Sequence, residues 1–517
     1  MPHLIIDEKN VTVSEGQTVL DACHGVGIEI PTLCYLRGFR VHTSCMVCMV
    51  QEKKSNTLIP SCSARATEGM IIETDNEEVR EFRKEAIELL LSEHVGSCEG
   101  PCELACPFHI NIPRMIRQIV AGGYNKAVET IKKKLPFPAT VSRICPAPCE
   151  KGCRRGRYDQ SVSIRLLVRY LADKDCASDR PYIPQCAQTT GKKVAIMGSG
   201  PAGLAAAYAI LREGHSCVIL DARPEPGGML RACVSETRLP HNVLDKELNV
   251  LRALGGEFRR ASIDIKDLAP EGLHKDFHAV GLCADDIVYR YKQSMKSYPH
   301  IFSIRVRAKG AEGGHMHPGR VAIGKMAAGI SVANEIKWFL KERRNARAQQ
   351  KIFSSKSWHI KSNDTAALGQ DAAVLPRVHP KAGSSTGFSS KEAERESKRC
   401  LGCDCTARDS CRLRVYATRY RAQQSHFRAR EEMECKGIDV HALLTYDPGK
   451  CIKCGLCVRI AEKAGAEYGF TFIGKGLGIR IGTPFHHSLS VIDHTLCDEC
   501  MKTCPTGALA YRMEHMT

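Results

Sequence analysis

The alternation of apolar and polar positions predicts several separate elements. Residues 77–93 repeat apolar positions at helical spacing, with Val79, Phe82, Ala86, Leu89 and Leu90 on one face and residue 75 or 76 as the cap. From 192 to 221 the pattern predicts a strand, a glycine turn, a helix and a second strand, and 324–338 predicts a closing helix. Residues 341–390 show little periodicity and predict a linker or a long surface excursion.

Length and composition limit the class of protein. The chain has 517 residues, which favours three or four domains. Hydrophobic residues make up 43% and charged residues 25%, which is typical of globular chains. The sequence lacks a run of about eighteen apolar residues, so we expect no membrane span. The first residues lack a basic segment followed by an apolar core, so we expect no secretory signal and a cytoplasmic location.

Cysteine use changes this picture. There are 27 cysteines against 14 Phe and 2 Trp. Disulfides are rare in the cytosol, so closely spaced cysteines favour metal sites. Twenty fall in batches, and the scattered remainder is best interpreted as small buried hydrophobes; the remainder is Cys23, Cys176, Cys186, Cys217, Cys233, Cys283 and Cys435. The net charge of +17 is spread out without a basic, aromatic-rich block, so we expect no nucleic-acid partner.

The first batch has the spacing of a binuclear cluster site. Its members are Cys34, Cys45, Cys48 and Cys62, flanked by 16–22, 27–34 and 68–74. These segments resemble the N-terminal domain of the 75-kDa subunit of NADH:quinone oxidoreductase and of related hydrogenase and formate dehydrogenase subunits. The resemblance implies a plant-type ferredoxin β-grasp over 1–76 holding one [2Fe-2S] cluster. A structural zinc is the alternative.

The next batches follow a His-x3-Cys spacing at His94 and Cys98. They are Cys98, Cys102 and Cys106, then Cys145, Cys149 and Cys153. They resemble the cluster domain of glutamate synthase small subunits and dihydropyrimidine dehydrogenase, which implies a helical domain over 77–185 with two [4Fe-4S] clusters. The implied sets are Cys98, Cys102 and Cys153, and Cys106, Cys145 and Cys149. His94 could complete the first set, or it is a surface histidine at a helix C-terminus; Val168 stands where relatives of the second carry Gln or Glu.

A glycine-rich turn predicts a dinucleotide site. Its residues are Gly198, Ser199, Gly200, Pro201, Ala202 and Gly203. The glycines permit a tight turn and close approach to a pyrophosphate, and Asp221 follows at the distance suited to ribose hydroxyls. With Gly227, Gly228 and 238–240, the segment resembles the FAD domain of glutamate synthase small subunits, here over 186–345. A scaffold that keeps this fold without flavin is the alternative.

One part of that family pattern is missing. The family has a second glycine-rich unit, its NAD(P)H domain, after the first half of the FAD domain. Here the chain runs from 277–281 to 301–304 and on to the closing helix without a second GxGxxG. About forty residues cannot hold a domain of about 100 residues. We therefore expect a truncated FAD domain without its own nicotinamide site.

The C-terminal part carries two further batches. After a linker over 346–390, the segment 391–435 contains Cys400, Cys403, Cys405 and Cys411, which suit one cubane or a zinc. Residues 436–517 resemble a bacterial two-cluster ferredoxin, which implies one complete [4Fe-4S] set, Cys451, Cys454, Cys457 and Cys504. The other set would need Cys497, Cys500, His494 and position 461, which is alanine, so we expect the second site to be lost or altered.

The sequence thus predicts a multidomain α+β and α/β protein with one [2Fe-2S] cluster, about four [4Fe-4S] clusters and FAD, or about eighteen irons. It shows no acid/base or nucleophilic constellation. The first hypothesis is an electron-transfer subunit of a cytoplasmic anaerobic complex, with a hydrogenase, a formate or aldehyde dehydrogenase, or an NAD(P)H flavoprotein as partner. The alternatives are a stand-alone NAD(P)H-dependent flavin oxidoreductase of the glutamate synthase small-subunit type and a zinc-stapled scaffold.

Overall fold

A computed structural model describes residues 1–261, 276–284, 288, 300–304, 318–341, 352–355, 375–381, 387–427 and 439–511. The chain divides into two compact units. Unit 1 combines 1–100, 350–373 and 402–517, and unit 2 combines 101–349 and 374–401. Each unit therefore joins segments that are far apart in sequence, whereas the predicted domains were continuous. No helix among the described residues is long and apolar enough to cross a bilayer.

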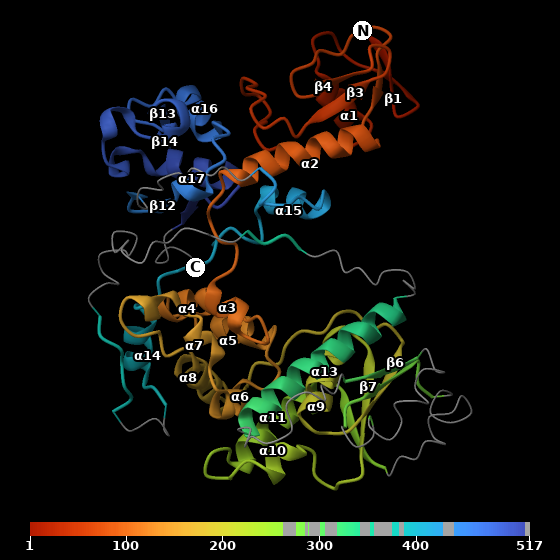
Figure 1. Ribbon diagram of the computed structural model, residues 1–517, viewed down its shortest axis with the longest axis vertical. Helices are drawn as coiled ribbons and strands as arrows, with labels where there is room; N and C mark the ends of the chain where they lie inside the picture. The colour runs from red at the N-terminus through yellow and green to blue at the C-terminus, as the bar shows by residue number, and fades with distance from the viewer. Residues whose placement is uncertain are drawn as a thin grey trace. The chain divides into compact units, whose positions relative to one another are not determined.

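The N-terminal part of unit 1 is a mixed sheet beside a short helix (Figure 1). The strand order is β2-β1-β5-β3-β4, with β1 parallel to β5 and the other pairs antiparallel. The elements are β1 (His3–Ile6), β2 (Lys9–Thr12), α1 (Val19–Gly25), β3 (Met49–Glu52), β4 (Thr57–Pro60) and β5 (Ile71–Glu73). Thr18 and Asp21 form a capping box that starts α1, whose residues Val19 and Leu20 are fully buried.

Helix α2 (Glu77–Ser92) confirms the predicted helix and one of its two proposed caps. The Asn76 side chain accepts a hydrogen bond from the Val79 amide at 2.8 Å. The predicted buried face is partly wrong, because Leu89 is 53% exposed. The inward face turns toward Ile87 and Arg83, since the buried Arg83 guanidinium donates to the Met49 carbonyl at 2.7 and 3.0 Å.

The C-terminal part of unit 1 is built from short elements. A sheet with the order β11-β12-β15 and a β13–β14 hairpin accompany α16 and α17, which pack on each other. The bounds are α15 (Arg412–Arg419), β11 (Asp439–Val440), β12 (Leu444–Tyr446), η6 (Pro448–Lys450), α16 (Leu456–Lys463), β13 (Thr471–Ile473), η7 (Gly476–Gly478), β14 (Arg480–Gly482), η8 (Pro484–His486), η9 (Leu489–Val491), α17 (His494–Thr503) and β15 (Leu509–Tyr511).

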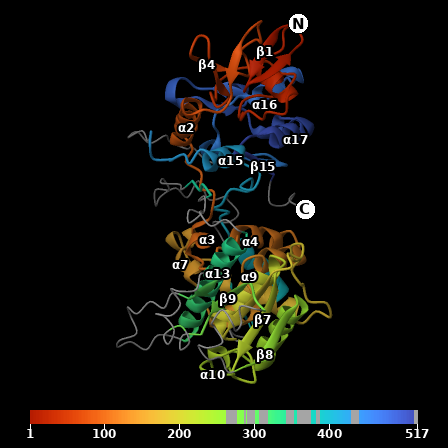
Figure 2. The ribbon, with the colours of Figure 1, turned by 90° about the vertical axis from the view of Figure 1, so that its right-hand side faces the viewer.

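Unit 2 begins with a group of short helices, seen in Figure 2 around α3, α4 and α7. These are α3 (Pro101–Ala105), α4 (Ile112–Val120), α5 (Tyr124–Lys132), α6 (Pro138–Ile144), α7 (Pro148–Lys151), η1 (Arg154–Arg157), α8 (Ile164–Cys176) and α14 (Ser390–Ser397). Helices α3 and α7 approach closely at Gly152, where a Cβ atom would lie 2.8 Å from the Ala105 Cβ. The sequence therefore needs glycine at this crossing.

The rest of unit 2 is a parallel sheet with the order β10-β9-β6-β7-β8. Its elements are β6 (Lys193–Met197), α9 (Pro201–Arg212), β7 (Ser216–Asp221), α10 (Met229–Ala232), α11 (His241–Ala253), β8 (Gly256–Arg260), β9 (Ala279–Leu282), β10 (Ile301–Ser303) and α13 (Pro318–Leu340). Helices α9 and α13 lie side by side against the sheet (Figure 1). A Cβ atom at Gly329 would lie 2.0 Å from the Ala202 carbonyl oxygen, so only glycine permits this contact. The predicted strands and closing helix are confirmed.

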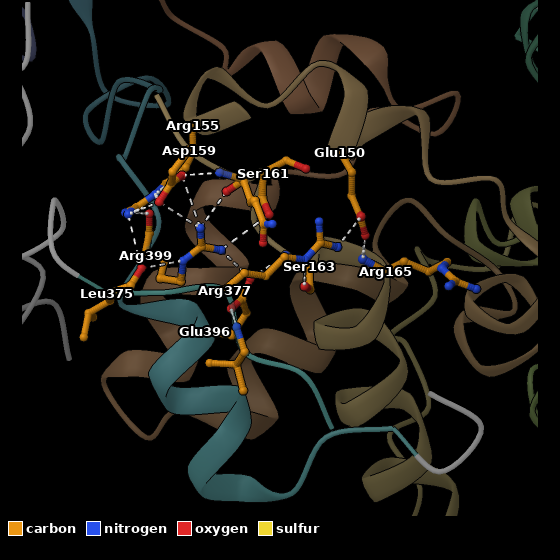
Figure 3. A network of polar contacts seen from close by, with 12 residues as sticks. Glu150, Arg155, Asp159, Ser161, Ser163, Arg165, Leu375, Arg377, Glu396 and Arg399 are labelled. Atoms are coloured by element: carbon orange, nitrogen blue, oxygen red, sulfur yellow. Dashed lines mark hydrogen bonds and ion pairs between the residues drawn. The ribbon is translucent and has the colours of Figure 1, made fainter. Parts of the chain in front are cut away.

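A buried ion-pair network fastens α14 to the turn before α8 (Figure 3). The Arg399 guanidinium is fully buried, pairs with Glu396 at 2.9 Å and with Asp159 at 3.2 Å, and donates to the Leu375 carbonyl at 3.0 Å. Arg155 pairs with the same Asp159 at 2.7 Å. Paired guanidiniums can be buried without leaving an uncompensated charge. Leu375 belongs to the predicted linker, most of which lies outside the described residues, so this described stretch packs against unit 2.

Candidate functional site

The first batch of cysteines lies in the loop between α1 and β3 and in the turn after β4. The thiols of Cys34, Cys45, Cys48 and Cys62 are all at most 4% exposed. The Sγ atoms of Cys48 and Cys62 lie 3.3 Å apart. A hydrogen bond from the Cys45 thiol, helped by the positive charge of Arg459, lowers the pKa of Cys34. A hydrogen bond with Cys62 likewise lowers the pKa of Cys48, to about 7. Two of the four thiols are therefore already biased toward the thiolate, the form that binds metal.

The ferredoxin-like batch surrounds a cavity. Its walls include Cys451, Cys454, Cys457, Cys500 and Cys504. Burial raises the pKa of Cys451 to about 11 and that of Cys454 to about 12. Bare thiols would therefore stay protonated at neutral pH, and a bound cation is needed to hold them as thiolates. The structure brings the four predicted ligands to one cavity and adds Cys500 to its wall.

The second half of the ferredoxin pattern is packed with apolar side chains. Cys497 is fully buried, and the core around it contains Ala461, Phe470 and Leu496. A Cβ atom at Gly469 would lie 2.6 Å from the Ala461 Cβ, so the chain passes close to position 461. The His494 ring stacks edge-on against His441 with 5.0 Å between the ring centroids. The loss of the second site stays a prediction.

A buried arginine joins the first two cysteine sites. Arg459 on α16 is 3% exposed. Its guanidinium donates to the carbonyls of Cys34 and Arg40, both at 2.6 Å, and to those of Cys454 and Gly455, both at 3.3 Å. Arginine suits this role because its planar fork carries several donors in fixed directions. Sequence analysis missed this residue, because the residues it joins are about 420 positions apart.

A third group of thiols combines two segments that are far apart in the sequence. Cys98, Cys405 and Cys411 are 6%, 7% and 7% exposed. The Cys405 amide donates to the Cys98 carbonyl at 3.2 Å. Burial, with smaller contributions from Cys405, Cys98 and Cys504, raises the pKa of Cys411 to about 12. The structure thus places Cys98 with two members of the C-terminal batch, a grouping that the sequence did not predict.

His94 lies close to this third group. It is 7% exposed, and its Nδ1 atom is buried without a hydrogen-bond partner. Burial and the nearby Lys450 ammonium lower the pKa of the imidazole to about 4, so it is neutral at pH 7. The Lys450 pKa is raised, because Asp447, Cys405 and Asp404 outweigh the opposing effect of burial. The alternative of a surface histidine is therefore wrong.

In unit 2, three predicted ligands line a second cavity. Its walls include Cys106, Cys145, Cys149, Arg165 and Val168. Burial raises the pKa of Cys149 well above its usual value, which again indicates that a cation is needed to hold a thiolate there. Val168 occupies the predicted fourth position and offers no ligand atom.

The remaining thiols of unit 2 lie nearby. Cys102 is buried, and Cys153 and Cys400 are half-buried against the same core. The Arg155 guanidinium, two residues after Cys153, donates to the carbonyl of Arg399 at 2.9 Å (Figure 3). This bond and the Arg399 ion pairs fix the segment before Cys400 against the Cys153 turn. Cys400 thus belongs to unit 2 and Cys403, Cys405 and Cys411 to unit 1, although sequence reasoning put all four in one set.

The glycine-rich turn has the geometry of a dinucleotide cradle. Gly198 has φ +101°, and a Cβ atom at Gly203 would lie 1.7 Å from the Gly198 carbonyl oxygen, so both positions need glycine. In front of Gly200, by contrast, a Cβ atom would meet nothing within 4 Å. This open space lies at the N-terminus of α9, where backbone amides and the helix dipole attract phosphate. The turn therefore fits a bound pyrophosphate.

Two further predicted residues support this turn. Asp221, at the end of β7, accepts hydrogen bonds from the Ser199 amide and hydroxyl, both at 2.7 Å. A Cβ atom at Gly228 would lie 2.8 Å from the Gly200 Cα, and the Gly227 amide donates to the Ser199 carbonyl at 3.0 Å. The Pro201 and Ala202 positions begin α9. All nine predicted cofactor residues therefore lie together, but Asp221 is bonded to the turn itself.

The described His, Cys, Asp and Glu side chains form no group of three or more around a point that one metal ion could occupy. A cluster with an inorganic sulfide core spaces its thiolates around several irons, and two of the thiol groups border cavities.

Comparison with known families assigns three segments. Residues 3–77 match the 2Fe-2S iron-sulfur cluster binding domain. Residues 75–180 match the family described as dihydropyrimidine dehydrogenase domain II, 4Fe-4S cluster. Residues 196–261 match the NAD(P)-binding Rossmann-like domain. The chain therefore carries a [2Fe-2S] domain, a [4Fe-4S] domain and a Rossmann-like dinucleotide-binding domain, as predicted, and FAD as the particular dinucleotide stays a prediction.

Three curated relatives extend this picture. The chain is similar to the NADP(+)-dependent formate dehydrogenase subunit beta of Moorella thermoacetica, 34% identical over 202 residues, covering 35% of this chain and 29% of that protein. It is 36% identical over 185 residues to the NADPH-Fe(3+) oxidoreductase subunit beta of Geobacter sulfurreducens, covering 35% and 28%. It is 34% identical over 191 residues to the glutamate synthase [NADPH] small chain of Mycobacterium tuberculosis, covering 37% and 39%. The chain thus spans less than two fifths of the length of each relative.

Proposed function

We propose that this chain is an electron-transfer subunit of a cytoplasmic multi-subunit redox complex. It relays electrons through [2Fe-2S] and [4Fe-4S] clusters and FAD between a partner dehydrogenase or hydrogenase and an acceptor. Two of the relatives named above are beta subunits, of a formate dehydrogenase and of an NADPH-Fe(3+) oxidoreductase, which supports partners of this class. The matched [2Fe-2S] and [4Fe-4S] domains support the type of carrier.

The observation that carries the proposal is the Arg459 bridge. One buried guanidinium contacts the backbone of both Cys34 and Cys454, so the first two thiol sites share one wall inside unit 1. Cys504 of the same cavity is linked to the third group by the backbone, because the Arg412 amide after Cys411 donates to the Pro505 carbonyl after Cys504 at 3.0 Å. Three thiol groups therefore lie in succession within unit 1. Electron transfer between clusters requires such neighbouring sites, whereas structural zinc ions do not.

The proposed ligands follow the geometry. Cys34, Cys45, Cys48 and Cys62 hold the binuclear cluster, and Cys451, Cys454, Cys457 and Cys504 hold one cubane. Cys106, Cys145 and Cys149 supply three thiolates to another, and Cys102 and Cys153 contribute to a further one. When bound, the clusters would act as one-electron carriers. The chain's own residues hold the thiolates, exclude water by burial and place positive charge, such as Arg459 and Lys450, beside them.

For the dinucleotide, we propose FAD on the 198–203 turn. The open space in front of Gly200 and the α9 N-terminus would take the pyrophosphate, and the 227–228 loop packs behind it. Asp221 would keep the turn in place through Ser199 while facing the ribose side. The printed sequence has no second GxGxxG, which supports a flavin that exchanges electrons with clusters and not with a nicotinamide bound to this chain.

The alternative is a stand-alone NAD(P)H-dependent oxidoreductase, because the M. tuberculosis relative is named for NADPH. One experiment separates the two functions. The full chain is purified without oxygen, assayed for iron, sulfide and flavin, and mixed with NADPH alone and then with dithionite. We expect about eighteen irons, no bleaching by NADPH and full reduction by dithionite with paramagnetic signals. Bleaching by NADPH alone would favour the alternative, and zinc without sulfide would refute both.

A further inference from the structure

The third thiol group shows features of a built metal site whose members no single sequence motif contains. Cys98 follows α2, whereas Cys405 and Cys411 precede α15, about 300 residues later. The Cys405 amide bonds to the Cys98 carbonyl, and all three thiols are buried in unit 1. Arg414, whose amide donates to the Cys411 Sγ at 3.4 Å, pairs at 3.8 Å with Glu99, the residue after Cys98. The sequence put Cys98 with Cys102 and Cys153, and Cys405 and Cys411 with Cys400.

Hydrogen bonds to sulfur prepare two of these thiols. The Ser355 amide donates to the Cys98 Sγ at 3.4 Å, and the Ser355 Oγ lies 3.2 Å from the same atom. The Arg414 amide donates to the Cys411 Sγ at 3.4 Å. Donors of this kind stabilise thiolates on iron–sulfur clusters and tune their potentials. Ser355 is itself anchored, because its hydroxyl contacts the Gly96 carbonyl at 2.6 Å.

A buried cation compensates negative charge at the same place. The Lys450 side chain is 14% exposed and pairs with Asp447 at 3.0 Å. A Cβ atom at Gly96 would lie 2.4 Å from the Lys450 Cγ, so the glycine between His94 and Cys98 lets the lysine pass. The amides of Val95 and Gly96 both donate to the Gly449 carbonyl, at 2.8 and 3.2 Å. A site that must take several thiolate charges out of water needs such a partner.

The fourth candidate ligand is His94. The imidazole is buried, and its Nδ1 atom has no hydrogen-bond partner. Buried polar atoms are almost always paired, so this orphan points to a group that the chain alone does not supply. The Lys450 side chain passes Gly96, which stands midway between His94 and Cys98 in the sequence. An imidazole beside thiolates is a known ligand combination for iron–sulfur clusters, and it lowers the negative charge of the site.

We propose that His94, Cys98, Cys405 and Cys411 hold one [4Fe-4S] cluster, and that Cys400 belongs to a different cluster, with Cys102 and Cys153 in unit 2. This inference rests on the proposed function, since it assumes that the chain binds iron–sulfur clusters. It extends the relay, because the Arg412 amide, one residue after Cys411, donates at 3.0 Å to the carbonyl of Pro505, one residue after Cys504 of the ferredoxin-like cavity. The proposed cluster links two segments that are about 300 residues apart in the sequence.

Iron counts on paired variants of the full chain test the grouping. In Cys98→Ser/Cys405→Ser both changes fall in one site, so we expect the loss of about four irons, no more than in either single variant. In Cys400→Ser/Cys405→Ser the changes fall in two sites, and we expect a loss of about eight. The sequence grouping predicts the reverse. Losses of about eight in the first and about four in the second would overturn the proposal.

Three controls separate this outcome from general damage. Cys23→Ala removes a fully buried thiol of unit 1 outside the four ligands and should lose no iron. The [2Fe-2S] electron paramagnetic resonance signal should persist in every variant, which shows that unit 1 has folded. A wild-type chain without iron or sulfide would refute the proposed function itself, whereas an iron-loaded wild type with the reversed pattern would refute only this inference.

The histidine has its own test. We expect His94→Ala to lose at least one iron per chain and to change the spectrum of one cubane. His94→Cys should keep the full iron count and lower the potential of that cubane, because a thiolate replaces a neutral ligand. Unchanged iron and spectra in His94→Ala, with loss in Cys403→Ser, would show that Cys403 is the fourth ligand and would overturn the assignment of His94.

Discussion

Replacement of Arg459 tests whether the first two cysteine sites are coupled. Its guanidinium is 3% exposed and contacts the backbone of both Cys34 and Cys454. Arg459→Met removes one buried positive charge beside two sites that gain electrons. The reduced forms should become less stable, so both midpoint potentials should fall. Arg459→Lys keeps the charge but loses the planar fork that reaches several carbonyls at once.

The size of the shift follows from Coulomb's law. A unit charge about 10 Å from a redox centre, at an effective dielectric constant of about 20, changes the energy of an added electron by about 1.7 kcal/mol. For a one-electron couple, in which a tenfold change corresponds to about 59 mV, this energy is about 70 mV. We therefore expect Arg459→Met to lower both potentials by about 70 mV and Arg459→Lys to shift them much less.

Potentiometric titration followed by electron paramagnetic resonance measures both shifts. Lys463→Met is the matched control, because Lys463 lies one turn further along α16, carries the same charge and is exposed. Water and salt screen its charge, so its removal should leave the potentials nearly unchanged. Equal shifts in the Arg459→Met and Lys463→Met variants, or a shift of only one cluster in Arg459→Met, would refute the reasoning. Wild-type iron content would show that the variants have folded.

Three further predictions concern unit 2. Val168→Cys should add a fourth thiolate to the cavity of Cys106, Cys145 and Cys149. After a brief exposure to oxygen, this variant should retain more iron than the wild type. An equal iron content would count against an open fourth position. Gly200→Val should remove flavin without lowering the iron content, because the valine side chain would fill the open space in front of position 200. Gly203→Val should instead lower the thermal midpoint, because its side chain would clash with the Gly198 carbonyl oxygen. Retention of flavin in Gly200→Val would exclude this turn as the flavin site. Burial raises the pKa of Glu247 from 4.5 to about 7. Between these two pH values the folded chain keeps a proton that the unfolded chain has released. The free energy of unfolding therefore decreases as the pH rises from about 4.5 to 7. The thermal midpoint of wild type relative to Glu247→Gln should fall over that window, and a constant difference would contradict it.

Local patterns made the Rossmann-like part predictable. The glycines at 198 and 203 are required by contacts a few residues away, and β6, α9 and β7 follow one another directly along the chain. The helix after the first sheet was likewise predicted to within a residue of its ends, because Asn76 caps it locally. Its inward face was less predictable, since the burial of Arg83 depends on the distant Met49 carbonyl.

The thiol grouping illustrates the limit of spacing arguments. Motifs assign cysteines to the nearest batch, but Cys98 contacts Cys405, and Cys400 is fixed to the Cys153 turn by Arg155 and Arg399. Ser355 lies in a stretch without periodicity, so nothing in the sequence indicated that it contacts a thiol. Contacts between segments separated by about 300 residues leave no local pattern to detect.

The contact between Cys98 and Cys405 also sets an order of events during synthesis. A ribosome adds about 5–20 residues per second, so about 15–60 s pass between the emergence of one residue and the other. Unit 1 cannot close during that interval, and its early thiols remain open to oxygen and stray metals. Cluster insertion into unit 1 must therefore wait until residues 402–517 have been synthesised. A messenger RNA truncated before codon 405 would yield a protein in which unit 1 stays incomplete.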